Sequence, residues 1–340
     1  MRKRAFSLAT FLCVIAASAL LLSLSFWVSA HAQRPAGQRL SLAPRYEPGQ
    51  VIRYQLETTI ANQAHHSGAV KDPQAPGKLT MNWSAITRME VLSVGNDAQG
   101  KPDGSVRLRS TYEKSAATAT SDTFNPEAQS LEDQYRALEG KSFEFALDAT
   151  GRVTEIKGLE AIGEKGNSAD ALRAWLSQIS SASGAPPGGV DVGQTWTTQQ
   201  PVESAPLAGL MWEGRSTYTR NEPCQPANKA GDANAMAGET CAVILAKLTL
   251  TGLKPGHDPT PERYRKLGLR TAGTWAGEGD SLSYVSLRTG RLVSVTQTSR
   301  EEMNFTVTTD AGENRVSYQG SVQSHSQLAL LPSIPSPAKN

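Results

Sequence analysis

The sequence predicts a mainly β (α+β) protein, built as an antiparallel curled sheet or open barrel with two helices, either as one unit or as two similar halves. Three observations indicate this fold class. Apolar and polar residues alternate over several long stretches, as they do in half-buried strands. Short polar turns separate these stretches, and such turns join only antiparallel neighbours. Two segments carry apolar residues at helical spacing instead.

The first half, residues 46–183, is expected to open with three strands. Alternation runs through 52–60, then 79–91, then 106–112, which predicts an antiparallel meander. Between the first two strands, residues 62–78 hold two histidines, two prolines and two glycines, a composition typical of a loop.

Two helices are expected later in this half. The first begins near Pro126, which suits a first helical turn, and ends at Gly140. The second spans 168–183. Between them, alternation from 143 and a Thr-Gly-Arg turn predict a hairpin. The apolar face of the first helix consists of Leu131, Tyr135 and Leu138.

The second half, residues 184–330, follows a Gly- and Pro-rich break at 184–189 that marks the boundary between the halves. The Gly-rich stretch 273–280 reads as a turn. A second Thr-Gly-Arg turn at 289–291 repeats the one at 150–152, which indicates two similar hairpins or two related half-domains. Strands are expected near 213–221, 241–251, 268–276, 281–288, 291–299, 302–309 and 314–329.

The first 32 residues have the three parts of a secretory signal peptide: a cationic start, an apolar run and an A-x-A site ending at Ala32. Cleavage there predicts a periplasmic or extracellular protein, soluble or peripheral, that is not an integral membrane protein. The alternative is an uncleaved anchor helix, because the apolar run approaches the length of a membrane span. Residues 33–45 are expected to form a loose arm, and residues 331–340 a disordered Pro-rich tail.

Cysteine usage and charge fit an exported chain. Of three cysteines, Cys13 lies in the leader, which leaves Cys224 and Cys241 for a disulfide in an oxidising compartment; two free thiols are the alternative. Without the leader, 31 basic residues face 32 acidic ones. This balance argues against nucleic acid as a partner, since phosphate binding needs an excess of clustered Lys and Arg.

Four short segments, at 46–54, 103–105, 147–153 and 192–196, resemble an uncharacterised family of secreted bacterial proteins with the pattern P-G-x-x-x-R-Y, D-x-T-G-R-V, V-G-x-T-W. The resemblance implies no activity and no functional residues. More distantly, the pattern of strands and helices is similar to the lipoprotein carriers of the Gram-negative envelope. That likeness implies a curled sheet around an apolar cavity, and lipid binding.

No catalytic residues, metal ligands or cofactor site are predicted, because the sequence lacks the nucleophile-elbow, zinc-protease, phosphate-loop and dinucleotide motifs. His65 and His66 are neighbours on an extended chain and point apart, so they do not predict a metal site. The adjacent Glu301 and Glu302 are expected to be solvated. Three tryptophans near turns either fill the core or line a ligand site: Trp196, Trp212 and Trp275.

Two functions are therefore expected in the first place: a non-enzymatic periplasmic binding protein for an apolar or amphipathic ligand, or a structural or interaction protein of the cell envelope. Their partners would be a lipid or an envelope protein. A hydrolase with an unfamiliar site is the weaker third reading, since it needs titratable groups within hydrogen-bond reach of each other.

Overall fold

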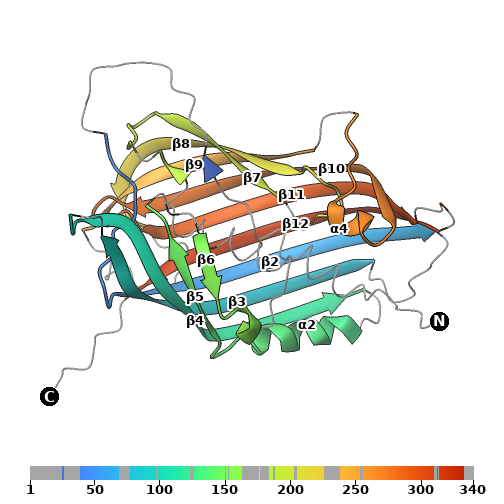
Figure 1. The fold of residues 1–340 in the computed structure, drawn as a ribbon, viewed down its shortest axis with the longest axis horizontal. Helices are drawn as coiled ribbons and strands as arrows, with labels where there is room; N and C mark the ends of the chain where they lie inside the picture. The colour runs from blue at the N-terminus through green and yellow to red at the C-terminus, as the bar shows by residue number, and fades with distance from the viewer. Residues whose placement is uncertain are drawn as a thin grey trace.

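The computed structural model describes residues 25–26, 39–68, 77–96, 99–122, 126–149, 151, 153–162, 176, 184–186, 188–202, 205–225, 238–252, 256–309, 312 and 314–332. Most of the leader, the end of the tail and, apart from Leu176, the expected second helix lie outside these residues. Over the described part, every strand of the predicted sheet belongs to one antiparallel sheet of 12 strands (Figure 1), which confirms the fold class.

The strands are β1 (Ser25–Phe26), β2 (Val51–Gly68), β3 (Lys78–Asn96), β4 (Pro102–Ser121), β5 (Ser142–Leu147), β6 (Val153–Lys157), β7 (Thr195–Pro201), β8 (Met211–Pro223), β9 (Thr240–Thr251), β10 (Leu269–Ser286), β11 (Leu292–Thr309) and β12 (Arg315–Leu331). The helices are α2 (Pro126–Arg136), α4 (Glu262–Arg265) and the 3₁₀ turn η1 (Leu159–Ile162).

The last strand of the chain, β12, lies beside β2 in the middle of the sheet. The order is β1-β7-β8-β9-β10-β11-β12-β2-β3-β4-β5-β6. Consecutive strands pair from β2 to β6 and from β7 to β12. The ladder between β12 and β2 joins these two runs, from Val316 opposite Gly68 to Leu331 opposite Arg53. The sheet therefore includes strands from both halves of the chain. The sheet is not closed. One edge strand is β6, and the other is β7, to which the short β1 adds two residues.

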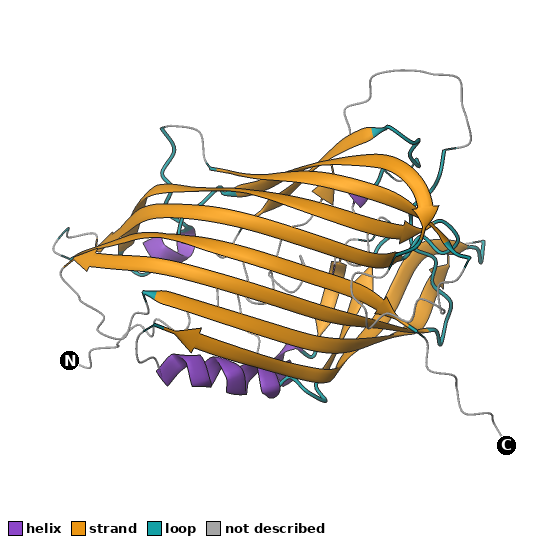
Figure 2. Cartoon of the chain, turned by 180° about the vertical axis from the view of Figure 1, so that it is seen from behind, coloured by secondary structure: helices purple, strands orange, loops and turns teal. Residues whose placement is uncertain are grey.

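Side chains alternate between a buried and an exposed face along nearly every long strand, as the period of two predicts. We call the buried side the inner face and the opposite side the outer face. Figure 2 shows the sheet from behind, with long curved strands running across it.

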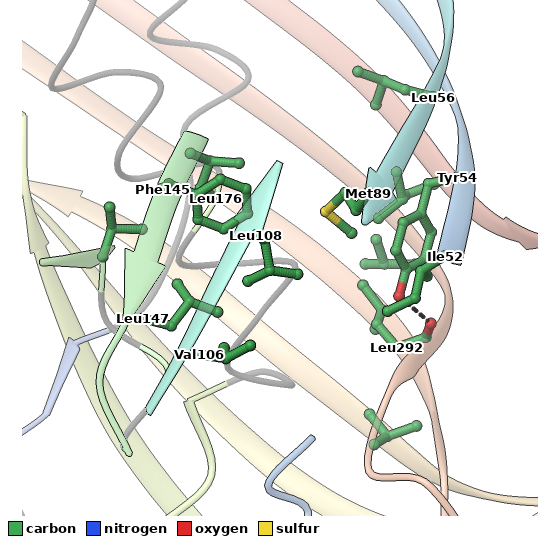
Figure 3. Packing of buried hydrophobic residues seen from close by; sticks show 14 of the residues in the cluster. Ile52, Tyr54, Leu56, Met89, Val106, Leu108, Phe145, Leu147, Leu176 and Leu292 are labelled. Carbon is green, nitrogen blue, oxygen red and sulfur yellow. Dashed lines mark hydrogen bonds between the residues drawn. The ribbon is translucent and has the colours of Figure 1, made fainter. Parts of the chain in front are cut away.

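Two apolar clusters cover the inner face. The larger one, which we call the Tyr54 cluster, gathers side chains from every strand from β2 to β12, together with Leu42, Leu176 and Val190; Figure 3 shows part of it. Its Tyr54 hydroxyl donates a hydrogen bond of 2.9 Å to the Leu292 carbonyl, which ties β2 to β11. The second, the Trp275 cluster, consists of Ile60, Met81, Ala205, Leu207, Leu210, Trp212, Ala246, Leu248, Leu250, Trp275, Met303, Phe305 and Val322.

The helix α2 confirms the prediction for its segment. It begins at Pro126, and the turns that follow it end at Gly140, which has a φ of 77°. Leu131 is buried, and Tyr135 and Leu138 pack against the Tyr54 cluster. The helix lies along β4, where the Ser115 hydroxyl donates to the Tyr135 carbonyl (Figure 1).

Three local predictions are wrong. The expected loop at 62–78 is strand as far as Gly68, because pairing with β12 holds polar residues in the ladder as well as apolar ones. The expected turn at 273–280 lies inside β10, where glycines permit close packing against β11 and no turn forms. The part of the expected loose arm that the structure describes, 39–45, is packed, with Leu42 buried in the Tyr54 cluster.

The predicted cysteine pair forms a disulfide. Cys224 follows the end of β8 and Cys241 lies near the start of β9, with the two Cα atoms 4.9 Å apart. The bridge therefore joins the two strands where the connecting loop leaves the β8–β9 hairpin, and Cys241 is fully buried beside Val243 and Tyr284.

Replacing both cysteines with alanine is expected to lower the free energy of unfolding by about 3 kcal/mol, because the bridge closes a loop of 17 residues in the unfolded chain. Urea denaturation of the oxidised protein and of the variant measures the difference. Reductant should shift the midpoint of the original protein and leave that of the variant where it is. Equal midpoints for the two oxidised proteins would show that the bridge adds no stability.

Candidate functional site

A carboxyl group is buried in the middle of the inner face. Glu301, on β11, is 2% exposed, although carboxylates are almost never fully buried without a partner. In the ladder it lies opposite Gly277 of β10 on one side and Val322 of β12 on the other.

Gly277 gives this carboxyl its space. A Cβ atom on Gly277 would lie 2.9 Å from Glu301 Cγ and 3.1 Å from Trp212 Cη2. Both distances are shorter than ordinary van der Waals contact, so the Glu301 and Trp212 side chains lie together over a backbone that only glycine leaves bare.

Trp275 forms the second wall of the site. Its indole N–H donates a hydrogen bond of 2.9 Å to Glu301 Oε2. The ring is parallel to Phe305 within 3°, with 6.2 Å between centroids, and Phe305 in turn stacks on Tyr318 at 4.8 Å. This row of rings fixes the orientation of the indole and so the position of Oε2.

The other carboxyl oxygen, Oε1, has no hydrogen-bond partner within the part of the chain that the structure describes. Burial raises the pKa of Glu301 from 4.5 to about 7, and the Trp275 hydrogen bond opposes this rise only in part. No charged side chain contributes to the shift. At neutral pH the carboxyl is therefore present in both its protonated and its ionised form, with one oxygen able to accept a further hydrogen bond.

Four more inner-face polar atoms lack a partner among the described residues, each on a different strand. An unpartnered buried polar group costs about 1–3 kcal/mol, so native structures leave few of them without a partner from the chain, from solvent or from a ligand. These atoms are Asn62 Oδ1 on β2, Thr87 Oγ1 on β3, Ser110 Oγ on β4 and Ser216 Oγ on β8.

The structure brings two of the three candidate tryptophans together. Trp212 and Trp275 both belong to the Trp275 cluster and flank Glu301, whereas Trp196 lies in the Tyr54 cluster on β7. All three are at least 92% buried. They lie on the inner face of the sheet. Burial there is what both alternatives predict, a tryptophan that fills the core and one that lines an interior ligand site.

Glu301 itself corrects the sequence prediction. Neighbouring residues do point to opposite faces, and Glu302 is exposed on the outer face in an ion pair with Arg300, as expected. Glu301 is not solvated, however, because it shares its side of the strand with Met303 and Phe305. The alternation across 299–305 carried this signal, since a charged residue two positions from Met303 must lie on the same face.

A groove of about 800 Å³ lies across the middle of the outer face, over β9, β10, β11, β12 and β2. Within it Lys247 pairs with Asp280, and Arg300 pairs with Glu302 at 3.0 Å. Exposed pairs of this kind are solvated and contribute little energy. The carboxyl groups that line the groove, Glu278 and Asp280, are exposed, in contrast to that of Glu301.

Within the described ranges, no three His, Cys, Asp or Glu side chains lie close enough together to hold a metal ion. The helices in those ranges are all too short or too polar to cross a membrane.

Comparison with known proteins does not identify a family. No family model matches the chain, and no curated protein does. Among solved structures, an outer membrane channel from Pseudomonas putida F1 aligns over 88% of this chain and all of its own, with 7% identity and a TM-score of 0.18. A second solved structure, "Asymmetric conductivity of engineered proteins", aligns over 83% of this chain and all of its own, with 6% identity and a TM-score of 0.17. Superpositions this poor carry no functional argument.

The raised pKa of Glu301 predicts a pH-dependent stability. Below pH 4.5 both folded and unfolded states hold the proton. Between pH 4.5 and about 7 only the folded state holds it, so the free energy of unfolding falls as pH rises, by about 3 kcal/mol in total. Glu301→Gln should lose this fall and be the more stable protein at pH 8. Urea denaturation from pH 4 to 8 measures it, with the outer-face variant Glu302→Gln as control. Parallel curves for Glu301→Gln and the original protein would contradict the assignment.

Proposed function

We propose that this chain is an exported, non-enzymatic binding protein whose apolar or amphipathic ligand lies against the inner face of the sheet, around Glu301. The observation that carries the proposal is the unpartnered carboxyl oxygen Glu301 Oε1 on the buried face, with Asn62 Oδ1, also unpartnered among the described residues, two strands away on the same row of the ladder. A ligand with an apolar body and a few polar atoms provides what such a surface lacks.

Binding explains the site better than catalysis does. Acid–base or nucleophilic chemistry needs a second titratable group near the first, so that the two can share or exchange a proton. Around Glu301 the groups that touch the carboxyl or the space beside it are an indole, a glycine and a second indole ring. These groups orient and enclose a ligand, and they transfer no proton.

Export is supported by the disulfide and by the pattern of the first 32 residues. A disulfide between the two strands of a hairpin persists in oxidising compartments such as the bacterial periplasm. The cationic start, apolar run and A-x-A site are the features that an export pathway recognises.

The unclosed sheet suits reversible binding. In the part of the chain that the structure describes, no ladder joins β6 to β7 or β1, so backbone hydrogen bonds do not close the sheet into a ring. We propose that a ligand reaches the inner face between these edges, by displacing side chains and not by breaking strand pairing.

The proposal is tested by producing the full chain with its leader in a Gram-negative bacterium and purifying it from the periplasm. Native mass spectrometry should show a bound mass that an organic extract of the same sample recovers as lipid or another amphiphile. Gly277→Val should reduce the bound fraction at least several-fold, since its side chain would fill the space between Glu301 and Trp212.

Ala276→Val is the matched control, because Ala276 is the exposed neighbour on the outer face. Circular dichroism confirms that both variants fold. A protein that carries no mass and yields no extractable molecule contradicts the proposal and favours a structural or interaction role in the cell envelope.

A further inference from the structure

The groove on the outer face offers open space for a ligand. It has a volume of about 800 Å³ and crosses β9, β10, β11, β12 and β2. In the ladders, Glu278 lies opposite Thr249 on one side and Arg300 on the other, and Arg300 lies opposite Gln323. Neighbouring strands are about 4.8 Å apart, so these four side chains form one row across the groove.

Three planar polar groups of this row are able to bind a ligand. Glu278 and Arg300 face each other at a separation where charged side chains can pair, yet none of the ion pairs in the described part of the chain joins them. Arg300 bonds through Nη2 to Glu302 on its own strand, which leaves its Nε and Nη1 without a partner among the described residues. Within the same ranges, the Glu278 carboxylate and the Gln323 amide have neither a hydrogen bond nor an ion pair.

The lining of the groove disfavours both charged polymers and apolar ligands. Two basic side chains, Lys247 and Arg300, balance two acidic ones, Glu278 and Asp280, so with histidine neutral the lining has no net charge that would attract a polyanion. Apart from Ala61, the side chains that project into the groove from the outer face are polar. An apolar ligand would remove these groups from water and leave them without partners, which costs free energy.

A neutral sugar chain matches this chemistry. Each hydroxyl group donates one hydrogen bond and accepts up to two. The ionised Glu278 only accepts, Arg300 only donates and Gln323 does both, and each has polar atoms in one plane that can bind two adjacent hydroxyl groups. An extended peptide is a poorer match, because it adds to a sheet through backbone hydrogen bonds at an edge, and each strand under the groove already has a neighbour on both sides.

We infer that the outer-face groove binds a neutral oligosaccharide, whose hydroxyl groups bond to Glu278, Arg300 and Gln323 on three neighbouring strands. The next row of the ladder, in which Thr298 lies opposite His325, also lines the groove and provides further polar contacts. The described lining contains no ring of Phe, Tyr or Trp on which a sugar could stack, so binding relies on hydrogen bonds. This site lies on the opposite face of the sheet from the proposed amphiphile site and is independent of it.

The test is an NMR titration of the protein purified from the periplasm, with three neutral tetrasaccharides (maltotetraose, cellotetraose and chitotetraose) and the anionic tetragalacturonate as probes. At least one neutral tetrasaccharide should shift the amide signals of groove residues on β10, β11 and β12, and tetragalacturonate should bind more weakly. Glu278→Ala and Gln323→Ala should each raise the dissociation constant of that neutral sugar at least threefold, because each variant removes hydrogen bonds to the ligand.

Gln319→Ala is the matched control, because Gln319 is an exposed glutamine on the same face of β12 that does not line the groove. It should leave the dissociation constant unchanged. All three substituted side chains are exposed, and circular dichroism checks that the variants fold. The inference is overturned if no neutral tetrasaccharide binds, or if tetragalacturonate binds more tightly than the neutral sugars. Binding that Glu278→Ala and Gln323→Ala leave unchanged places the sugar elsewhere and overturns the assignment of the groove.

Discussion

The structure depends on one constraint: strands of up to 20 residues must keep a strict two-residue alternation across a single continuous sheet. Over most of the sheet only one face is buried, so the parity of a residue decides whether it meets the core or water; beside the disulfide both faces are covered, and Val243 and Val293 are buried on the opposite face. A register shift of one residue in any ladder would reverse every side chain beyond it. The irregularities in pairing fall near strand ends or in β3 and β4, and the ladder through Asn62, Val322 and Glu301 is regular.

That regularity makes the polar content of the inner face informative. A sheet selected only for stability would place apolar residues at these positions, because a buried carboxyl costs free energy and packs no better than a methionine. Instead, a belt of polar residues crosses the face between the two apolar clusters, with Ser299 and Ser324 hydrogen-bonded at 2.7 Å and Glu301 beside them. Departures from a consistent core concentrate at functional positions, which is why we place the binding site there.

Much of the fold could be predicted from the sequence, and the site only in part. The alternation predicted β2, β3, β8, β9 and β12, and spacing with a proline and a glycine predicted α2. The two strands expected at 291–299 and 302–309 are one continuous strand, β11. The length of β10 was not predicted because Gly277 and Gly279 are residues typical of turns. In the structure they lie within the strand, where the absence of a side chain lets residues of β8 and β11 pack against the backbone. The pairing of β12 with β2 has no local signal at all. Trp212 and Trp275 were candidates from their residue type, but their meeting at Glu301 depends on that long-range register.

The position of β12 also bears on how the chain reaches its folded state. The last strand of the sequence sits between β11 and β2, so the two sets of strands on either side have no ladder between them until the C-terminal residues are available. Contacts this distant in sequence form slowly, because a long loop must close first. A growing chain of this topology therefore has an incomplete sheet until its C-terminal strand is available. The same delay leaves strand edges exposed during folding, and exposed edges favour aggregation.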